Sequence, residues 1–102
     1  MSNLNSVIHQ PVRLRIMAAL SALPEDAQLD FVALRKMLDL TDGNLSVHLR
    51  KLEDAGYVQV EKAFVGRKPR TYLAATPEGR KAFAEHVQAL QAIIQRNETN
   101  AP

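Results

Sequence analysis

The chain has 102 residues, 46% of them hydrophobic and 24% charged, which fits one small globular domain and does not favour disorder. It contains no cysteine, so disulfides, thiolate nucleophiles and cysteine-ligated metal sites are excluded. The first residues lack the basic and apolar regions of a signal peptide. The longest apolar run, residues 16–20, is far shorter than the roughly 20 residues of a membrane span. We therefore expect a cytoplasmic protein without a membrane segment.

The net charge is only +2, but the charges are unevenly placed. Residues 41–75 carry six basic and four acidic side chains, whereas the segments before and after them are balanced. Lys62, Arg67, Lys68 and Arg70 lie close together with no acid among them. Such a cluster on a balanced chain indicates a polyanion that is bound by one face, and a solvated basic loop is the alternative.

An amphipathic helix is predicted at residues 7–23. Its apolar side chains recur three and four positions apart, and the helix ends before Pro24. A turn follows, after which we expect a very short strand to begin at Leu29.

Two further helices are predicted at residues 30–38 and 42–55, with a three-residue break between them. Asp30 and Thr41 are suitable N-caps, because their side-chain oxygens can accept hydrogen bonds from the free N–H groups of the first turn. Gly56 follows the third helix as a C-terminal stop. Two helices joined by so short a turn form a helix-turn-helix.

A β-hairpin with a basic tip is predicted at residues 57–75. Apolar and polar side chains alternate on both sides of a loop at residues 65–69. A last helix is predicted at residues 77–96, with Thr76 as its cap and Pro77 at its first position. The order of elements is that of a winged helix-turn-helix. We expect a mainly α fold with a small β-hairpin (α+β), a single domain over residues 1–102 and a C-terminal dimerisation helix.

Three separated stretches support this assignment. They are LTDGNLSVHLRKLEDAGYV at residues 40–58, KAFVGRKPRT at 62–71 and TPEGR at 76–80. In this order they resemble the recognition segment, the wing and the start of the last helix of small bacterial stand-alone winged-helix transcriptional regulators related to the MarR and ArsR families. The resemblance covers roughly residues 9–94. It implies a DNA-binding transcriptional regulator that acts as a homodimer.

The third helix is predicted to enter the major groove of double-stranded DNA. Its leucines at 45, 49 and 52 define a buried stripe, so the other faces are available for contact. Asn44 suits adenine, and Arg50 suits guanine or a phosphate. The alternative is that Asn44 and Ser46 only cap and solvate a short helix. The residues predicted to bind DNA here are Thr41, Gly43, Asn44, Ser46, Val47, Arg50 and Lys51.

The wing is predicted to hold the DNA backbone or the minor groove through Arg67, Lys68 and Arg70. Such contacts raise affinity more than they select sequence. Gly66 permits the bend of the wing, and Pro69 stiffens it.

The last helix carries apolar residues at the spacing of a heptad seam. Left in water, the end of this seam and the start of the chain would expose a large apolar patch, so we expect two-fold pairing. The alternative is that the last helix folds back onto its own subunit. The predicted dimerisation residues are Val7, Ile8, Phe83, Val87, Leu90 and Ile94.

No catalytic motif is found, so we expect no enzymatic activity. His9, His48 and His86 lie far apart and lack the spacing of metal ligands, so no metal or cofactor is expected either. His48 is expected to be a packed, hydrogen-bonded histidine. The sequence leaves room for a small-molecule effector but does not indicate one.

Two other functions stay open at this stage. A winged helix can bind protein instead of DNA, or it can be an accessory domain of an enzyme. Binding to DNA at low salt separates the first alternative from a DNA reader. Capped helices near both ends lead us to expect a stand-alone protein.

Overall fold

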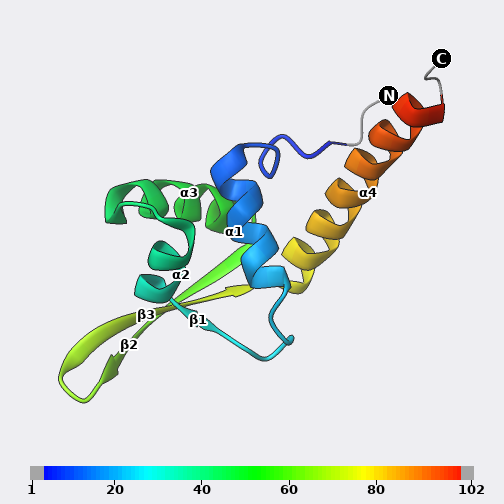
Figure 1. Cartoon of the computed structure of the whole chain (residues 1–102). Coiled ribbons are helices and arrows are strands. Elements are labelled where there is room, and N and C mark those ends of the chain that lie inside the picture. Colours follow the sequence, from blue (N-terminus) through cyan, green and yellow to red (C-terminus); the bar gives the residue numbers. More distant parts are fainter. Residues whose placement is uncertain (1–3, 100–102) are drawn as a thin grey trace.

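The computed structural model describes residues 4–99, including the side chains of residues 4–96. Its mainly α, α+β winged helix-turn-helix confirms the fold predicted from the sequence. No helix in this part of the chain is long and apolar enough to cross a membrane. In chain order the elements are α1 (Pro11–Ser21), β1 (Leu29–Asp30), α2 (Phe31–Leu38), α3 (Asp42–Asp54), β2 (Val58–Val65), β3 (Lys68–Ala75) and α4 (Pro77–Thr99) (Figure 1).

Helix α1 begins at Pro11, later than the predicted start at residue 7. Pro11 suits the first turn because the N–H that it lacks has no partner within a helix. The Gln10 side chain caps the helix by accepting a hydrogen bond from the Arg13 N–H at 2.9 Å. The residues before it form a separate turn, in which the Asn5 side chain accepts two backbone N–H groups. The apolar spacing continues through both turns, so periodicity alone placed the start too early.

Two capped helices form the helix-turn-helix. The Asp30 carboxylate accepts the Ala33 N–H at 3.2 Å, and the Thr41 hydroxyl accepts the Asn44 N–H at 3.1 Å, which confirms both predicted caps. Helix α2 ends at Leu38 and is followed by Asp39, whose φ of 55° is left-handed. Aspartate tolerates this conformation better than most side chains, because its short polar group can bond locally. The chain therefore turns within three residues and continues as α3.

The sheet is antiparallel, with the strand order β1-β3-β2. Strand β1 is the very short strand expected at Leu29. Strands β2 and β3 pair along their whole length, up to Val65 opposite Lys68. The loop is therefore two residues long, shorter than the loop predicted at residues 65–69. Gly66 makes this possible with a φ of 67°, because a left-handed residue closes a two-residue turn that follows the strand twist.

The core lies where α1, α2, α3 and the base of the hairpin meet. Each helix contributes apolar positions three or four apart, as the amphipathic spacing predicted. The hairpin contributes only residues near its base, so its outer half projects beyond the core. The buried apolar side chains are Ile8, Ile16, Met17, Leu20, Leu34, Leu38, Leu45, Leu49, Leu52, Val58, Leu73 and Ala75.

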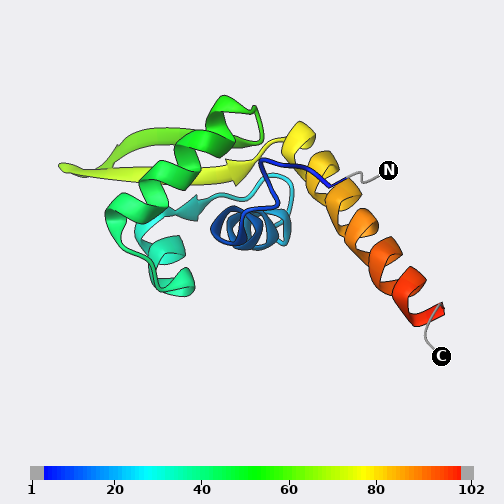
Figure 2. The same ribbon diagram turned by 90° about the horizontal axis from the view of Figure 1, so that it is seen from above.

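The hairpin and α4 project from opposite ends of this core (Figures 1 and 2). The molecule measures 62 × 25 × 22 Å along its principal axes. Its Cα radius of gyration of 15.5 Å exceeds the roughly 13 Å expected for a compact domain of this length. Both projections offer surface that the core does not use.

The start of α4 is fixed to the end of α3 by a set of residues that we call the α3–α4 junction: Gly56, Tyr57, Thr76, Gly79 and Arg80. The Thr76 N–H donates to the Tyr57 carbonyl at 3.0 Å. The Thr76 hydroxyl donates to the Gly56 carbonyl at 2.6 Å and accepts the Gly79 N–H at 2.9 Å. Arg80 donates to the carbonyl of Ser21, the last residue of α1, and to the carbonyl of Pro24 in the turn that follows. The junction therefore connects α1, α3 and α4.

The segment before α1 lies against α4. The Asn5 N–H donates to Nδ1 of His86 at 3.0 Å, and its side-chain amide donates to the Tyr57 hydroxyl at 2.8 Å. His86 is fully buried and meets the edge of the His9 ring at a centroid distance of 5.3 Å. Ile8 is 0% exposed because this segment folds onto the core of its own chain. The prediction that Ile8 lies on a dimerisation surface is therefore corrected.

Gly79 has no room for a side chain, because a Cβ there would lie 2.1 Å from the Tyr57 carbonyl oxygen. We expect Gly79→Ala to lower the free energy of unfolding by about 2–4 kcal/mol, since backbone must move to relieve the clash. Urea denaturation followed by circular dichroism measures this change. Gly43→Ala is the matched control, because a Cβ at Gly43 meets nothing within 4 Å. It should be neutral or stabilising by up to about 1 kcal/mol. Equal stability of the two variants would contradict the packing at the junction.

Burial, and then the neighbouring His9, lower the pKa of His86 below its ordinary value of 6.5. The unfolded chain therefore binds a proton at His86 at a higher pH than the folded chain does. Above pH 6.5 this difference has little effect on the free energy of unfolding, because His86 is neutral in both states. We expect the free energy of unfolding to decline as the pH falls below 6.5, because the unfolded chain then takes up the proton first.

The variant His86→Asn removes this titration and keeps an acceptor for the Asn5 N–H. Its unfolding free energy should decline less than that of the wild type between about pH 6.5 and pH 5. Denaturant titrations at several pH values provide the comparison. Parallel declines would show that His86 does not carry the effect.

Candidate nucleic-acid interface

Helix α3 is buried on one side and exposed to solvent on the other. Its leucines at 45, 49 and 52 lie in the core. Hydrogen-bond donors, acceptors and cations on the exposed side can bond to base edges and phosphates. The structure leaves every position predicted to bind DNA on this helix and its cap exposed: Thr41, Gly43, Asn44, Ser46, Val47, Arg50 and Lys51.

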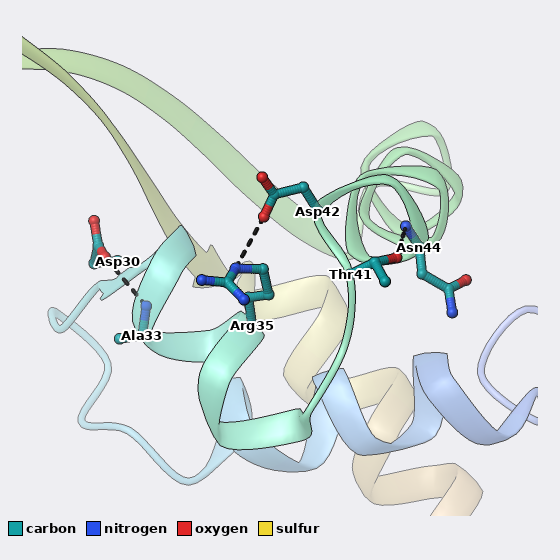
Figure 3. A network of polar contacts seen from close by, with 6 residues as sticks. All are labelled: Asp30, Ala33, Arg35, Thr41, Asp42 and Asn44. Carbon is teal, nitrogen blue, oxygen red and sulfur yellow. Dashed lines mark hydrogen bonds and ion pairs between the residues drawn. The ribbon is translucent and has the colours of Figure 1, made fainter.

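An ion pair with α2 and a hydrogen bond within its own first turn hold the start of α3 (Figure 3). The Thr41 hydroxyl takes up the backbone N–H of Asn44, while the Asn44 side chain points away from the helix. Asp42 lies in the first turn, where a carboxylate interacts favourably with the helix dipole. Nε of Arg35 lies 2.9 Å from its Oδ1. This cation offsets the Asp42 charge and reduces its repulsion of an approaching phosphate.

Arg13 connects α1 with α3 and with the start of the chain. Its guanidinium donates to the Val7 carbonyl and lies 3.3 Å from Nδ1 of His48. His48 is half-buried, which confirms that it is a packed, hydrogen-bonded histidine. Burial, and then the charge of Arg13, lower the pKa of His48. At neutral pH His48 is therefore uncharged and adds no charge to α3.

The cations of the wing are not equivalent. Arg67 and Lys68 are exposed at the tip, and within the described part of the chain neither has an ion-pair partner. Nη1 of Arg70 lies 3.7 Å from a carboxylate oxygen of Asp30, whose other oxygen caps α2. Residues 62–70 contain no acid in the sequence, because the acidic partner, Asp30, comes from a different element. Arg67 and Lys68 therefore place uncompensated charge at the tip of the wing, and Lys62, nearer to the core, has no ion-pair partner among the described residues either.

Helix α3 and the wing border a common groove of about 510 Å³. Helix α3 supplies Ser46 and Arg50 to it, next to Glu53 and Asp54, and the wing supplies Lys62. The exposed face of α3 and one face of the wing therefore lie on the same side of the molecule.

Helix α4 packs against the core near its start and is exposed to solvent near its end. Phe83 packs against the core, and Val87 lines a groove between α4 and α1. Leu90 is half-buried, whereas Ile94 is 57% exposed. Val7 packs partly on the core of its own subunit. The uncovered part of the predicted seam is therefore its last turns.

Three features of this surface were not predicted from the sequence: two ion pairs and the exposure of Phe64. The two ion pairs join charges from different elements, and no sequence signal distinguishes such acids from solvated ones. Phe64 is 76% exposed on the wing. Its signal was available, since it is an aromatic residue between Lys62 and Arg67. Among the described side chains, no three histidines, aspartates or glutamates come close enough together to hold a metal ion.

Comparisons with known proteins agree with this geometry. A family model described as a winged helix DNA-binding domain matches residues 12–94. An uncharacterized protein of Methanocaldococcus jannaschii is 36% identical over 81 residues, which are 79% of this chain and 85% of that protein. The structure of a transcriptional regulator homologue from Pyrococcus horikoshii OT3 is also 36% identical. It has a TM-score of 0.79, with 87% of this chain and 85% of that chain covered.

A third similarity is to a transcriptional regulator of the MarR family from Enterococcus faecalis V583. It is 28% identical, with a TM-score of 0.68 and coverage of 92% of this chain and 78% of that chain. The other two relatives are archaeal, so the likeness is not limited to the bacterial regulators that the motifs resembled.

Proposed function

Since the chain belongs to the winged helix DNA-binding domain family, we propose that it is a sequence-specific transcriptional regulator that binds double-stranded DNA as a homodimer. In this proposal α3 enters the major groove, and the wing lies on the neighbouring backbone or in the minor groove. The groove that α3 and the wing share carries the proposal, because one ligand surface can reach both elements.

Base recognition is assigned to the outer face of α3. The Asn44 side chain points outward, and an amide of this kind forms two hydrogen bonds with adenine in the major groove. Arg50 lines the shared groove and can bond to guanine or to a phosphate. Gly43 leaves the first turn of α3 open, so its backbone can come close to a phosphate at the positive end of the helix dipole.

The wing is assigned to affinity. Arg67 and Lys68 carry uncompensated charge, and neutralising phosphates with such cations releases counterions. Arg70 contributes less, since Asp30 already offsets part of its charge.

The homodimer is assigned to α4. Its last turns project from the core and expose Ile94, and a second copy offers the same face for two-fold pairing (Figure 2). Pairing of this kind places two recognition helices about one turn of DNA apart, roughly 34 Å.

The assignment of base contacts to α3 and phosphate contacts to the wing is tested with two sets of variants. Asn44→Ala should lose about 1–3 kcal/mol of binding free energy on a duplex selected from a random library, and little on a scrambled duplex.

Arg67→Ala combined with Lys68→Ala should weaken binding to both duplexes alike. It should also flatten the plot of log affinity against log salt by about one unit per lost phosphate contact. Fluorescence anisotropy at several salt concentrations measures both effects.

A matched control for the wing variant is Lys81→Ala combined with Arg96→Ala. It removes two exposed cations from α4 and should leave the salt slope unchanged. If the wild type binds neither duplex at low salt, the protein is not a DNA reader, and a protein-binding winged helix becomes the better reading. Equal losses for Asn44→Ala on both duplexes would assign Asn44 to the backbone or to a cap.

The assignment of the dimer to α4 is tested by Leu90→Glu combined with Ile94→Glu. Each copy would bring two carboxylates into the pairing surface, so the variant should be folded and monomeric, with much weaker binding to the selected duplex. Sedimentation at tens of micromolar measures the mass. Met37→Glu on α2 is the control, since Met37 is as exposed as Ile94 but lies on another element. A monomeric wild type, or a double variant that stays dimeric, would reject this surface.

A further inference from the structure

The tip of the wing is apolar as well as basic. Phe64 is 76% exposed, and Pro69 lies opposite it in the register of the two strands, so both lie on one face of the hairpin. Val65, which is 51% exposed, lies on the other face. No other large hydrophobic side chain in the described part of the chain is as exposed as Phe64. Exposed apolar residues that gather in one place, within a polar surrounding, mark a binding surface.

The strand register gives the direction in which Phe64 points. Side chains two apart on a strand share a face, so Phe64 lies on the same face as Lys62 and Val60. Val60 pairs with the buried Leu73, so this is the face that covers the core. Lys62 and Val60 also line the groove shared with α3. Phe64 therefore continues the inner face of the wing beyond the core, on the side of α3.

The tip is also closed by a tight turn. The strands stay paired up to Val65 and Lys68, and Gly66 closes the hairpin with a two-residue turn. Pro69 fixes the backbone angle opposite Phe64. A side chain on such a support loses little conformational freedom when it binds, so more of its burial appears as affinity.

The neighbours of Phe64 indicate the chemistry of the partner. Arg67 in the turn and Lys68, which pairs with Val65 on the other face of the hairpin, place uncompensated positive charge at the same tip. The minor groove of DNA offers the matching surface, since its edges are anionic phosphates and its interior is lined by sugars and base edges. Apolar side chains enter this groove and separate base steps in proteins that bend DNA.

We propose that Phe64 is a wedge that enters the minor groove beside the site read by α3 and partly opens a base step there. The inference rests on the proposed DNA-binding function and adds a specificity-determining residue to it. Pyrimidine–purine steps unstack most easily, so the wedge favours binding sites with such a step under the wing. The wing then selects sequence through DNA deformation, in addition to holding phosphates.

The first experiment compares Phe64→Ala and Phe64→Leu on the selected duplex. Phe64→Ala should weaken binding roughly tenfold through the loss of a buried aromatic side chain, and Phe64→Leu should retain most of the affinity. The salt slope should stay at the wild-type value in both variants, unlike in Arg67→Ala, because no charge is removed. The DNA bend, measured by energy transfer between dyes at the duplex ends, should decrease in Phe64→Ala. Thermal unfolding should not change, since the side chain is exposed.

The second experiment locates the wing tip. The chain has no cysteine, so Val65→Cys introduces a single attachment point for an iron chelate that cleaves DNA. Cleavage offset across the minor groove, next to a pyrimidine–purine step, supports the wedge. Cleavage across the major groove, or none, overturns it.

The outcomes separate this inference from the function on which it rests. If the wild type binds no DNA, the proposed function fails, and the wedge fails with it. If the wild type binds and bends the duplex but Phe64→Ala binds and bends it equally, only the wedge is overturned. Binding of the wild type, but not of Phe64→Ala, to anionic lipid vesicles in place of DNA would assign the tip to a membrane surface and would also overturn the wedge.

Discussion

The close contact between the first turn of α4 and the backbone of Tyr57 is the constraint on which the rest of the structure depends. Helix α3 ends at this point, the first wing strand begins there, and the second wing strand ends just before Thr76. One carbonyl of Tyr57 and one hydroxyl of Thr76 therefore fix three elements relative to each other. Any dimer formed through α4 acts on the position of α3 through this contact. The lack of space at Gly79 keeps the contact tight.

Two aspartates control how much positive charge this surface presents. Asp30 caps α2 and also offsets Arg70 on β3. Asp42 strengthens the start of α3 through the helix dipole, and Arg35 offsets it in turn. Cationic charge is thereby reduced near the helices and left free at the wing tip. In the proposed function, the polar face of α3 reads bases and the cations of the wing tip supply the long-range attraction.

The fold and most of the candidate site could be predicted from local patterns. The caps at Asp30 and Thr41 and the stop at Gly56 depend on contacts within a few residues, so the sequence shows them directly. The exposed face of α3 follows from the helical period and the leucine stripe. The start of α1 was placed too early because a turn at Asn5 continues the same apolar spacing. The loop of the wing was predicted to be longer than it is, because the ends of the strands depend on cross-strand pairing, which the sequence does not show.

The sequence by itself therefore determined the order of the elements, the buried and exposed faces of the helices and the position of the basic run. Only the tertiary structure decided that Ile8 lies in its own core, that Arg70 has an acidic partner and that Phe64 points to the side of α3. The physical reason is the range of the interactions. Capping and amphipathic spacing act over three or four residues, whereas the bond from Asn5 to His86 spans 81 positions of the chain. Contacts of that range exist only after the whole chain has folded.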